Sequence, residues 1–199
     1  NKRKYIDLAP YEIFSNNVLT FDEILRIKQT EDILEKYWND HRMNRTIEYL
    51  VEEVFDSPFD FFQEFGTYWD EQGWSKIGHQ LEDLFIRLSS FLKTKKLADE
   101  DVLLSLMKYD YLNHSRYKPR KPWWSQETSL SKEKKSQIYK QIVANPFLFG
   151  EEFVSLQLQE RDLYKHTLLE EMLILSSNEE EPSTHILLCY FDPSGKGSK

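Results

Sequence analysis

Apolar residues recur every three or four positions through the first half of the chain. This spacing places them on one side of a helix, whereas a strand would show alternation. It predicts helices at about 21–39, 44–56, 58–72, 76–97 and 99–112. Thr20 and Ser57 precede two of these segments, and their hydroxyls are suited to accept a hydrogen bond from a backbone N–H of the first turn. Pro58 then fits the first helical position.

Aromatic side chains form much of the apolar surface of these helices. One stripe lies on the third helix and consists of Phe61, Phe62, Phe65, Tyr68 and Trp69. The fourth helix carries an aliphatic and aromatic stripe made of Ile77, Leu81, Leu84, Phe85, Leu88, Phe91 and Leu92. Glu82, Asp83 and Arg87 are expected on its opposite, solvent-facing side. The helices are therefore predicted to pack around an aromatic-rich core.

The pattern changes in the second half of the chain. Residues 113–130 form a long connection with two prolines, and a further helix is predicted at about 131–144, capped by Ser131. Residues 147–163 fit both helix and strand, and we favour helix. Two apolar runs, 167–175 and 185–191, are separated by an acidic segment that contains Pro182, which predicts a β-hairpin.

These elements predict a mainly α fold of about six or seven amphipathic helices with a small C-terminal β-hairpin. We expect a single domain over 1–192, irregular over 1–19, helical over 20–163 and ending in the hairpin at 167–191. The Gly/Ser/Lys-rich tail 193–199 is expected to be disordered.

The composition excludes several kinds of cofactor site and a membrane-spanning helix. The 199 residues include one cysteine, which excludes a disulfide framework, a Cys₄ zinc site and an iron–sulfur cluster held by this chain. The six glycines form no dinucleotide-binding or P-loop motif. No apolar run approaches the ~18–20 residues of a membrane helix. One free cysteine and the lack of an export signal favour a cytoplasmic location.

The net charge is −8, which argues against nucleic acid and anionic membranes as bulk partners. The charge is uneven, because residues 116–140 contain eight basic and two acidic side chains. That window is therefore +6 and the rest of the chain −14. The first residue is Asn1 rather than methionine, which we interpret as a domain cut from a longer protein or a trimmed chain.

No residue is predicted to be catalytic or to ligate a metal. The five histidines lack metal-binding spacing, and we expect His79 to be a surface or capping residue of its helix. A strand at 167–175 would turn either Glu170 or Glu171 inward, and we predict that the inward carboxylate pairs with a buried basic group rather than acting in catalysis. Cys189 lies in an apolar run, which predicts a packing role.

The basic segment 116–124 is the main candidate for recognition. Its candidate ligand-binding residues are Arg116, Arg120, Lys121, Trp123 and Trp124. Arginine and lysine can hold a phosphate or carboxylate, and an indole can stack on a flat ligand or base. Alternatively, the loop anchors its two tryptophans in the core while its charges stay in water.

Seven segments together carry a family resemblance. They are LAPYEIF (8–14), LTFDEILR (19–26), YWN (37–39), PFDFF (58–62), KYDYL (108–112) with the later PW (122–123), KHTLLE (165–170) and LLCYFD (187–192). In this order they resemble the C-terminal domain of uncharacterised bacterial cobalamin-binding radical-SAM proteins. Such proteins are often labelled Fe–S oxidoreductase or magnesium-protoporphyrin IX monomethyl ester oxidative cyclase. Relatives often read more like Leu-Phe-Asp-Tyr in the last segment, so the end of the hairpin is expected to differ here.

The resemblance implies a parent enzyme with an upstream cobalamin-binding domain and an upstream radical-SAM domain of the same polypeptide. A C-x-x-x-C-x-x-C loop there would ligate a 4Fe–4S cluster that cleaves S-adenosylmethionine. The parent would be an oxidoreductase or methyltransferase, and this chain would be an accessory, substrate-positioning domain without catalysis of its own.

Two other functions compete with this interpretation. The first is a stand-alone helical interaction module that binds a protein or nucleic acid through the basic loop 116–124. The second is a small self-sufficient enzyme, which requires polar residues gathered in a deep pocket.

Overall fold

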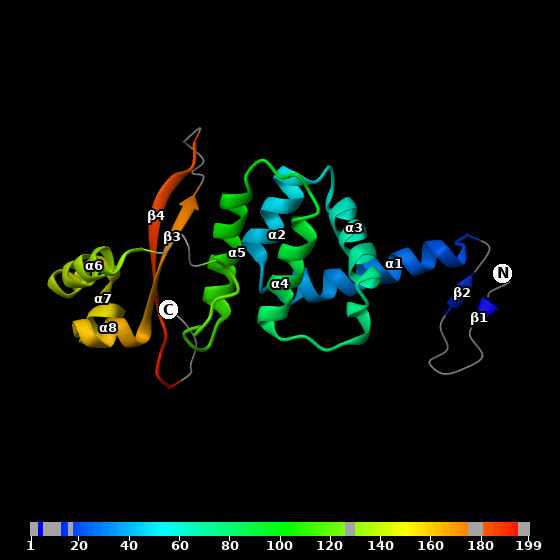
Figure 1. Cartoon of the computed structure of the whole chain (residues 1–199). Coiled ribbons are helices and arrows are strands. Elements are labelled where there is room, and N and C mark those ends of the chain that lie inside the picture. Colours follow the sequence, from blue (N-terminus) through cyan, green and yellow to red (C-terminus); the bar gives the residue numbers. More distant parts are fainter. Residues whose placement is uncertain (1–3, 6–12, 16–17, 126–129, 175–180, 195–199) are drawn as a thin grey trace. The chain divides into compact units, whose positions relative to one another are not determined.

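The computed structural model describes the chain apart from residues 1–3, 6–12, 16–17, 126–129, 175–180 and 195–199 (Figure 1). The described part is mainly helical and ends in an antiparallel hairpin, which confirms the predicted fold class. It divides into two compact units, Asn1–Leu97 and Ala98–Lys199, here called unit 1 and unit 2. The single domain expected over 1–192 stays a prediction. Most of the tail at 193–199 lies outside the described residues.

The described residues of unit 1 form two short strands and a series of helical segments. They are β1 (Lys4–Tyr5), β2 (Ile13–Ser15), α1 (Phe21–Leu34), the π-helix η1 (Glu35–Asn39), α2 (Asn44–Tyr49), the π-helix η2 (Leu50–Val54), α3 (Pro58–Glu71), the 3₁₀-helix η3 (Trp74–Lys76) and α4 (Leu81–Leu92). The irregular structure expected at 1–19 is thus wrong for β1 and β2, which pair antiparallel. Strands of two and three residues are too short to show a period in the sequence.

Helices α1 and α3 begin at side-chain caps, as the sequence predicts. The Thr20 hydroxyl accepts a hydrogen bond from the Glu23 amide, and the Glu23 carboxylate accepts one from the Thr20 amide at 2.7 Å. Ser57 accepts a hydrogen bond from the Asp60 amide at 3.2 Å, with Pro58 at the first helical position. Each cap satisfies backbone donors that have no partner within the helix.

The fourth helix is shorter than the sequence predicts. It was expected at 76–97, whereas α4 begins at Leu81, where Gln80 and Asp83 form a capping box. The Gln80 amide donates to the Asp83 carboxylate at 2.8 Å, which fixes the start of the helix four residues after Ile77. Ile77 matches the helical spacing, but it precedes the cap and is exposed.

Phe65 lies at the centre of the aromatic core of unit 1. Its ring contacts Tyr37 at 4.9 Å in an edge geometry and stacks on Phe91 at 4.8 Å between centroids. The next residue, Gly66, lies where α3 packs against the backbone of α1 at Gln29. A Cβ added at Gly66 would lie 2.8 Å from the carbonyl oxygen of Gln29, so this contact requires glycine.

In unit 2, the residues that the structure describes form one long helix, four shorter helical segments and the hairpin. They are α5 (Glu100–His114), α6 (Lys132–Ala144), the 3₁₀-helix η4 (Pro146–Phe149), α7 (Glu151–Ser155), α8 (Glu160–His166), β3 (Thr167–Ile174) and β4 (Ser183–Tyr190). Helix was favoured over strand for 147–163, and η4, α7 and the start of α8 confirm this.

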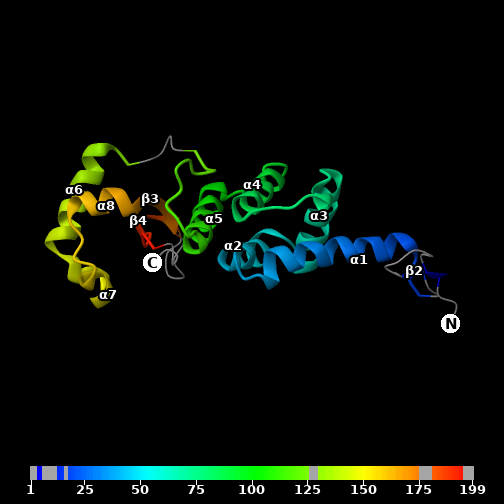
Figure 2. The ribbon, with the colours of Figure 1, turned by 90° about the horizontal axis from the view of Figure 1, so that it is seen from below.

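The hairpin of unit 2 lies between α5 on one face and α6, α7 and α8 on the other, as two views show (Figures 1 and 2). Successive residues of β3 serve these two faces in turn. Leu169 packs in a cluster with Tyr139 of α6 and Leu163 of α8. Glu170 is turned the other way, where it meets Lys108 of α5. Both faces of β3 are therefore covered, which explains why a charged residue in it is buried.

Candidate functional site

The five candidate residues of the basic loop 116–124 have two different environments. Arg116, Arg120 and Lys121 are exposed to solvent. Trp123 is half-buried, and Trp124 is buried with 4% of its surface exposed. The loop thus presents these three cations outward, and their binding role stays a prediction.

The two indoles of the loop pack against α5. The Trp123 and Trp124 rings lie 5.3 Å apart, and the Tyr111 ring contacts them at 6.3 and 5.7 Å. A buried indole has no free face for a base or planar ligand. For Trp124, the described geometry is therefore that of an anchor in the core of unit 2.

Glu170 is the buried centre that holds this arrangement together. Its Oε2 accepts a hydrogen bond from Lys108 Nζ and another from Trp124 Nε1, both at 3.2 Å. Less than a tenth of either charged side chain is exposed. The neighbouring Glu171 instead pairs with Lys134 at the surface. The prediction that the inward carboxylate pairs with a buried basic group is confirmed.

A second buried cation lies in unit 1, and the sequence did not predict its burial. Arg87 was expected on the solvent side of its helix, yet it is 8% exposed. Its guanidinium carbon lies 5.0 Å from the ring centroid of Trp69 and 5.4 Å from that of Trp74. The signal was present in the spacing, because Arg87 follows Leu84 by three residues and precedes Phe91 by four. That places it on the apolar face.

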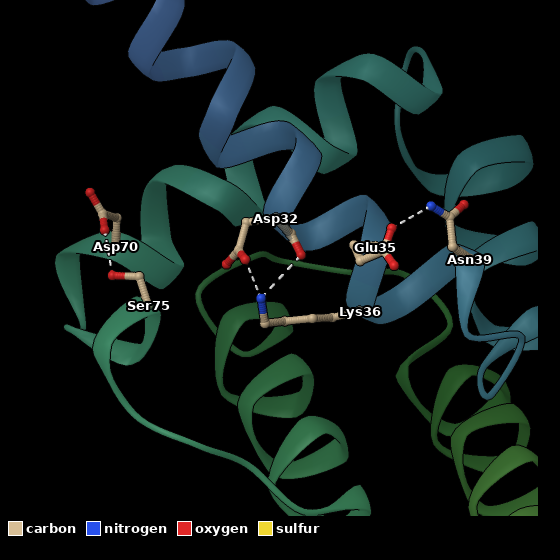
Figure 3. Close-up of polar contacts among 6 residues, drawn as sticks. All are labelled: Asp32, Glu35, Lys36, Asn39, Asp70 and Ser75. Atoms are coloured by element: carbon tan, nitrogen blue, oxygen red, sulfur yellow. Dashed lines mark hydrogen bonds and ion pairs between the residues drawn. The ribbon is translucent and has the colours of Figure 1, made fainter. Parts of the chain in front are cut away.

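A tight turn between α3 and η3 brings the two indoles together. Gly73 adopts a φ of 72°, in the left-handed region that glycine enters readily, and the chain reverses there. Ser75 then donates a hydrogen bond to Asp70 at 2.8 Å, which ties η3 back to α3 (Figure 3). The Trp69 and Trp74 rings lie 5.3 Å apart as a result.

A histidine and a lysine stand beside the same indole. The His79 ring lies 5.7 Å from the Trp69 ring, and Lys36 Nζ lies 5.9 Å from it. His79 was expected on the surface or at the cap of a helix, but it precedes the cap of α4 and is half-buried. Burial lowers its pKa, and the positive charges of Lys36 and Arg87 lower it further.

An ion pair and a buried tyrosine also contribute to the electrostatics around Trp69. Figure 3 shows Lys36 directed at Asp32, with which it forms an ion pair one helical turn away. Tyr37 is fully buried, and its hydroxyl donates to the carbonyl of Leu84 at 2.9 Å. Burial raises the Tyr37 pKa well above its ordinary value, partly offset by Arg87. The phenol is therefore neutral and serves as a structural donor.

A family model matches residues 2–188 of the chain, which is nearly its whole length. The chain belongs to the DUF4080 family. The description of this family is "Protein of unknown function (DUF4080)". No curated protein and no solved structure matches the chain. The resemblance to an uncharacterised domain is thus supported at the level of the family.

The lone thiol of this DUF4080 chain serves packing, as the sequence predicts. Cys189 is buried in β4, where its sulfur lies 3.9 Å from the Leu112 carbonyl oxygen. Within the described residues, no three or more histidine, cysteine, aspartate or glutamate side chains gather as a metal site. No helix in the described part of the chain is long and apolar enough to cross a membrane.

Among the described residues of the DUF4080 chain, unit 2 contains two open cavities, both mainly apolar. One of about 290 Å³ is lined by Phe149, Glu152, Phe153, Leu156, Leu188 and Tyr190. The other, of about 380 Å³, lies between the end of α6 and the residues before α8. Glu152 and Tyr190 are the ionisable side chains in the first lining and the second lining has none, so neither cavity brings two carboxylates or a histidine together for acid–base chemistry.

Proposed function

We propose that this chain is the C-terminal accessory domain of a cobalamin-dependent radical-SAM enzyme, and that it helps to position the substrate of that enzyme. The proposal assigns catalysis to a cobalamin-binding domain and a radical-SAM domain upstream in the same polypeptide. The 199-residue chain would be inactive by itself. The parent would be an iron–sulfur oxidoreductase or methyltransferase of the bacterial cytoplasm.

One observation carries the proposal: the segments behind the resemblance contact one another inside unit 2. The segment 108–112 supplies Lys108, which pairs with Glu170 of 165–170. The amide of Phe191, in 187–192, donates to the His166 carbonyl at 2.8 Å. Residues that characterise these segments are used for folding, which fits a supporting domain better than a self-contained active site.

The residues of this chain do not fit an iron–sulfur cluster. A 4Fe–4S cluster requires several thiolates, and the one thiol present is buried in β4 against a carbonyl. A buried thiol in apolar surroundings also resists ionisation. The cluster and the S-adenosylmethionine that it cleaves are therefore assigned to the upstream radical-SAM domain, and cobalamin to the domain before it.

The test begins with the reading frame that encodes the chain. We expect it to continue upstream and to encode C-x-x-x-C-x-x-C within the preceding ~350 residues, about two domains. The whole protein, purified without oxygen and supplied with iron and sulfide, should cleave S-adenosylmethionine to 5′-deoxyadenosine, whereas the 199-residue chain should not. A frame without that motif would refute the proposal.

The exposed cations of the basic loop support a second function, a stand-alone interaction module. Arg116, Arg120 and Lys121 face solvent, and Tyr117 beside them is 68% exposed. Such a module would bind an acidic protein or a nucleic acid with an affinity that falls as salt rises. Replacing the three cations with glutamine should abolish that binding. If the 199-residue chain captures no partner at low salt, this second function is excluded.

A further inference from the structure

Three buried nitrogen atoms without a hydrogen-bond partner belong to one indole of unit 1 and to two side chains beside it. They are Trp69 Nε1, His79 Nδ1 and Arg87 Nη1. The His79 ring and the Arg87 guanidinium carbon lie 5.7 and 5.0 Å from the Trp69 ring centroid. Buried polar groups in folded proteins nearly always have a partner, so three together call for an explanation.

Arg87 has no ion-pair partner among the described residues. Asp32 is paired with Lys36, and Asp70 accepts hydrogen bonds from Gln29 and Ser75. A buried guanidinium usually faces an anion, because burial of an unpaired charge is unfavourable. A negative group that accepts hydrogen bonds would therefore satisfy these donors.

The N–H groups of this cluster indicate which kind of negative group would bind. The guanidinium fork matches the paired oxygens of a carboxylate or phosphate. The Trp69 indole can only donate, and His79 can donate from Nδ1 in the matching tautomer. The indoles of Trp69 and Trp74 flank the guanidinium and keep water from competing.

We propose that Arg87, Trp69 and His79, with Lys36 beside them, form a binding site for an oxyanion: the carboxylate or phosphate group of a ligand. The site belongs to unit 1 alone. It does not depend on the function proposed for the chain, because it follows from unpartnered donors and unpaired charge within this unit.

The test uses the indole N–H signals of the ¹⁵N-labelled 199-residue chain in NMR spectra. Inorganic phosphate and acetate are the two probes, and sodium chloride at equal ionic strength is the control. We expect the Trp69 indole signal, assigned with Trp69→Phe, to move downfield and saturate with one or both probes. Phosphate alone, or acetate alone, identifies the source of the oxyanion. The Trp124 signal should stay in place, because its N–H already binds Glu170.

Substitutions separate this site from general charge effects. Arg87→Met should weaken binding about tenfold or more, the range for a hydrogen bond to a charged group. Arg26→Met, a matched change at an exposed arginine of α1, should leave it within about twofold. If Arg87→Met does not fold, Arg87→Lys, which keeps the charge but loses the fork, should still weaken binding.

Breaking the neighbouring ion pair should strengthen oxyanion binding, whereas the substitutions of Arg87 should weaken it. Asp32 holds Lys36, so Asp32→Asn should free the ammonium and tighten oxyanion binding about two- to fivefold. A purely structural Arg87 predicts no such gain. The proposal is overturned if neither probe moves the Trp69 signal, if chloride moves it equally, or if Arg87→Met binds as tightly as the parent chain. In those cases the three donors bind ordered water only.

Discussion

The buried ion pair of Lys108 and Glu170 in unit 2 allows a quantitative test of how much one buried contact contributes to the free energy of unfolding. Lys108 Nζ lies 3.2 Å from Glu170, with 7% and 6% of the two side chains exposed. Lys108→Met removes the cation and leaves the carboxylate buried with Trp124 as its remaining donor in this cluster. Loss of one partner of a buried pair lowers the free energy of unfolding by about 3–5 kcal/mol.

The double variant Lys108→Met with Glu170→Gln removes both charges but keeps an oxygen that can accept the Trp124 hydrogen bond. We expect it to regain about 2 kcal/mol or more relative to Lys108→Met, because no unpaired charge remains. Urea unfolding, followed by circular dichroism and tryptophan fluorescence, measures each free energy.

A matched control lies on the same strand. Glu171 pairs with Lys134 at 2.8 Å, but 31% and 53% of these side chains are exposed. Lys134→Met should therefore lower the free energy of unfolding by less than about 1 kcal/mol. The reasoning is refuted if the two lysine variants lose equal stability, or if the losses at Lys108 and Glu170 simply add.

Three further predictions follow from single positions. Gly66→Ala should lower the free energy of unfolding by about 1–3 kcal/mol, because its Cβ would meet the Gln29 carbonyl at 2.8 Å, and Gly78→Ala, with open space around it, should change it by less than about 0.5 kcal/mol. NMR titration should give His79 a pKa below the ordinary value for histidine, about 6.5. The folded state then binds fewer protons, so stability should fall as pH drops from about 6.5 through the folded pKa, and His79→Gln should remove this dependence. Cys189 should react with a thiol reagent only in denaturant; rapid reaction of the native chain would contradict its burial.

The sequence predicts those features of the fold that local chemistry determines. The caps at Thr20 and Ser57 are side-chain to backbone contacts within three residues, so the motif alone specifies them. The π-helical turns η1 and η2 have no such signature, because their wider hydrogen bonds interrupt the helical period only briefly. The sequence places the start of α4 too early, because Ile77 fits the apolar spacing of the helix although it precedes the N-cap at Gln80.

The candidate sites show where sequence reasoning stops. That one of two adjacent glutamates faces inward follows from strand alternation, and Glu170 does so. Its partner Lys108 lies 62 residues away along the chain, and only the packing of α5 on β3 selects it. The burial of Arg87 was missed because charge was given more weight than position, although its spacing from Leu84 and Phe91 places it on the apolar face.

The two buried cations then differ in one respect that stability can measure. Lys108 faces the carboxylate of Glu170, so replacing Lys108 leaves an unpaired carboxylate buried in the core. Arg87 faces two indoles, and the cost of burying its unpaired guanidinium offsets the gain from these cation–π contacts, so its replacement leaves no unpaired charge behind. Arg87→Met should therefore leave the free energy of unfolding within about 1 kcal/mol of the parent chain or raise it, while Lys108→Met lowers it by about 3–5 kcal/mol. A loss of that larger size at Arg87 would mean that the guanidinium serves the fold, whereas a stable variant without oxyanion binding would mean that it serves a ligand.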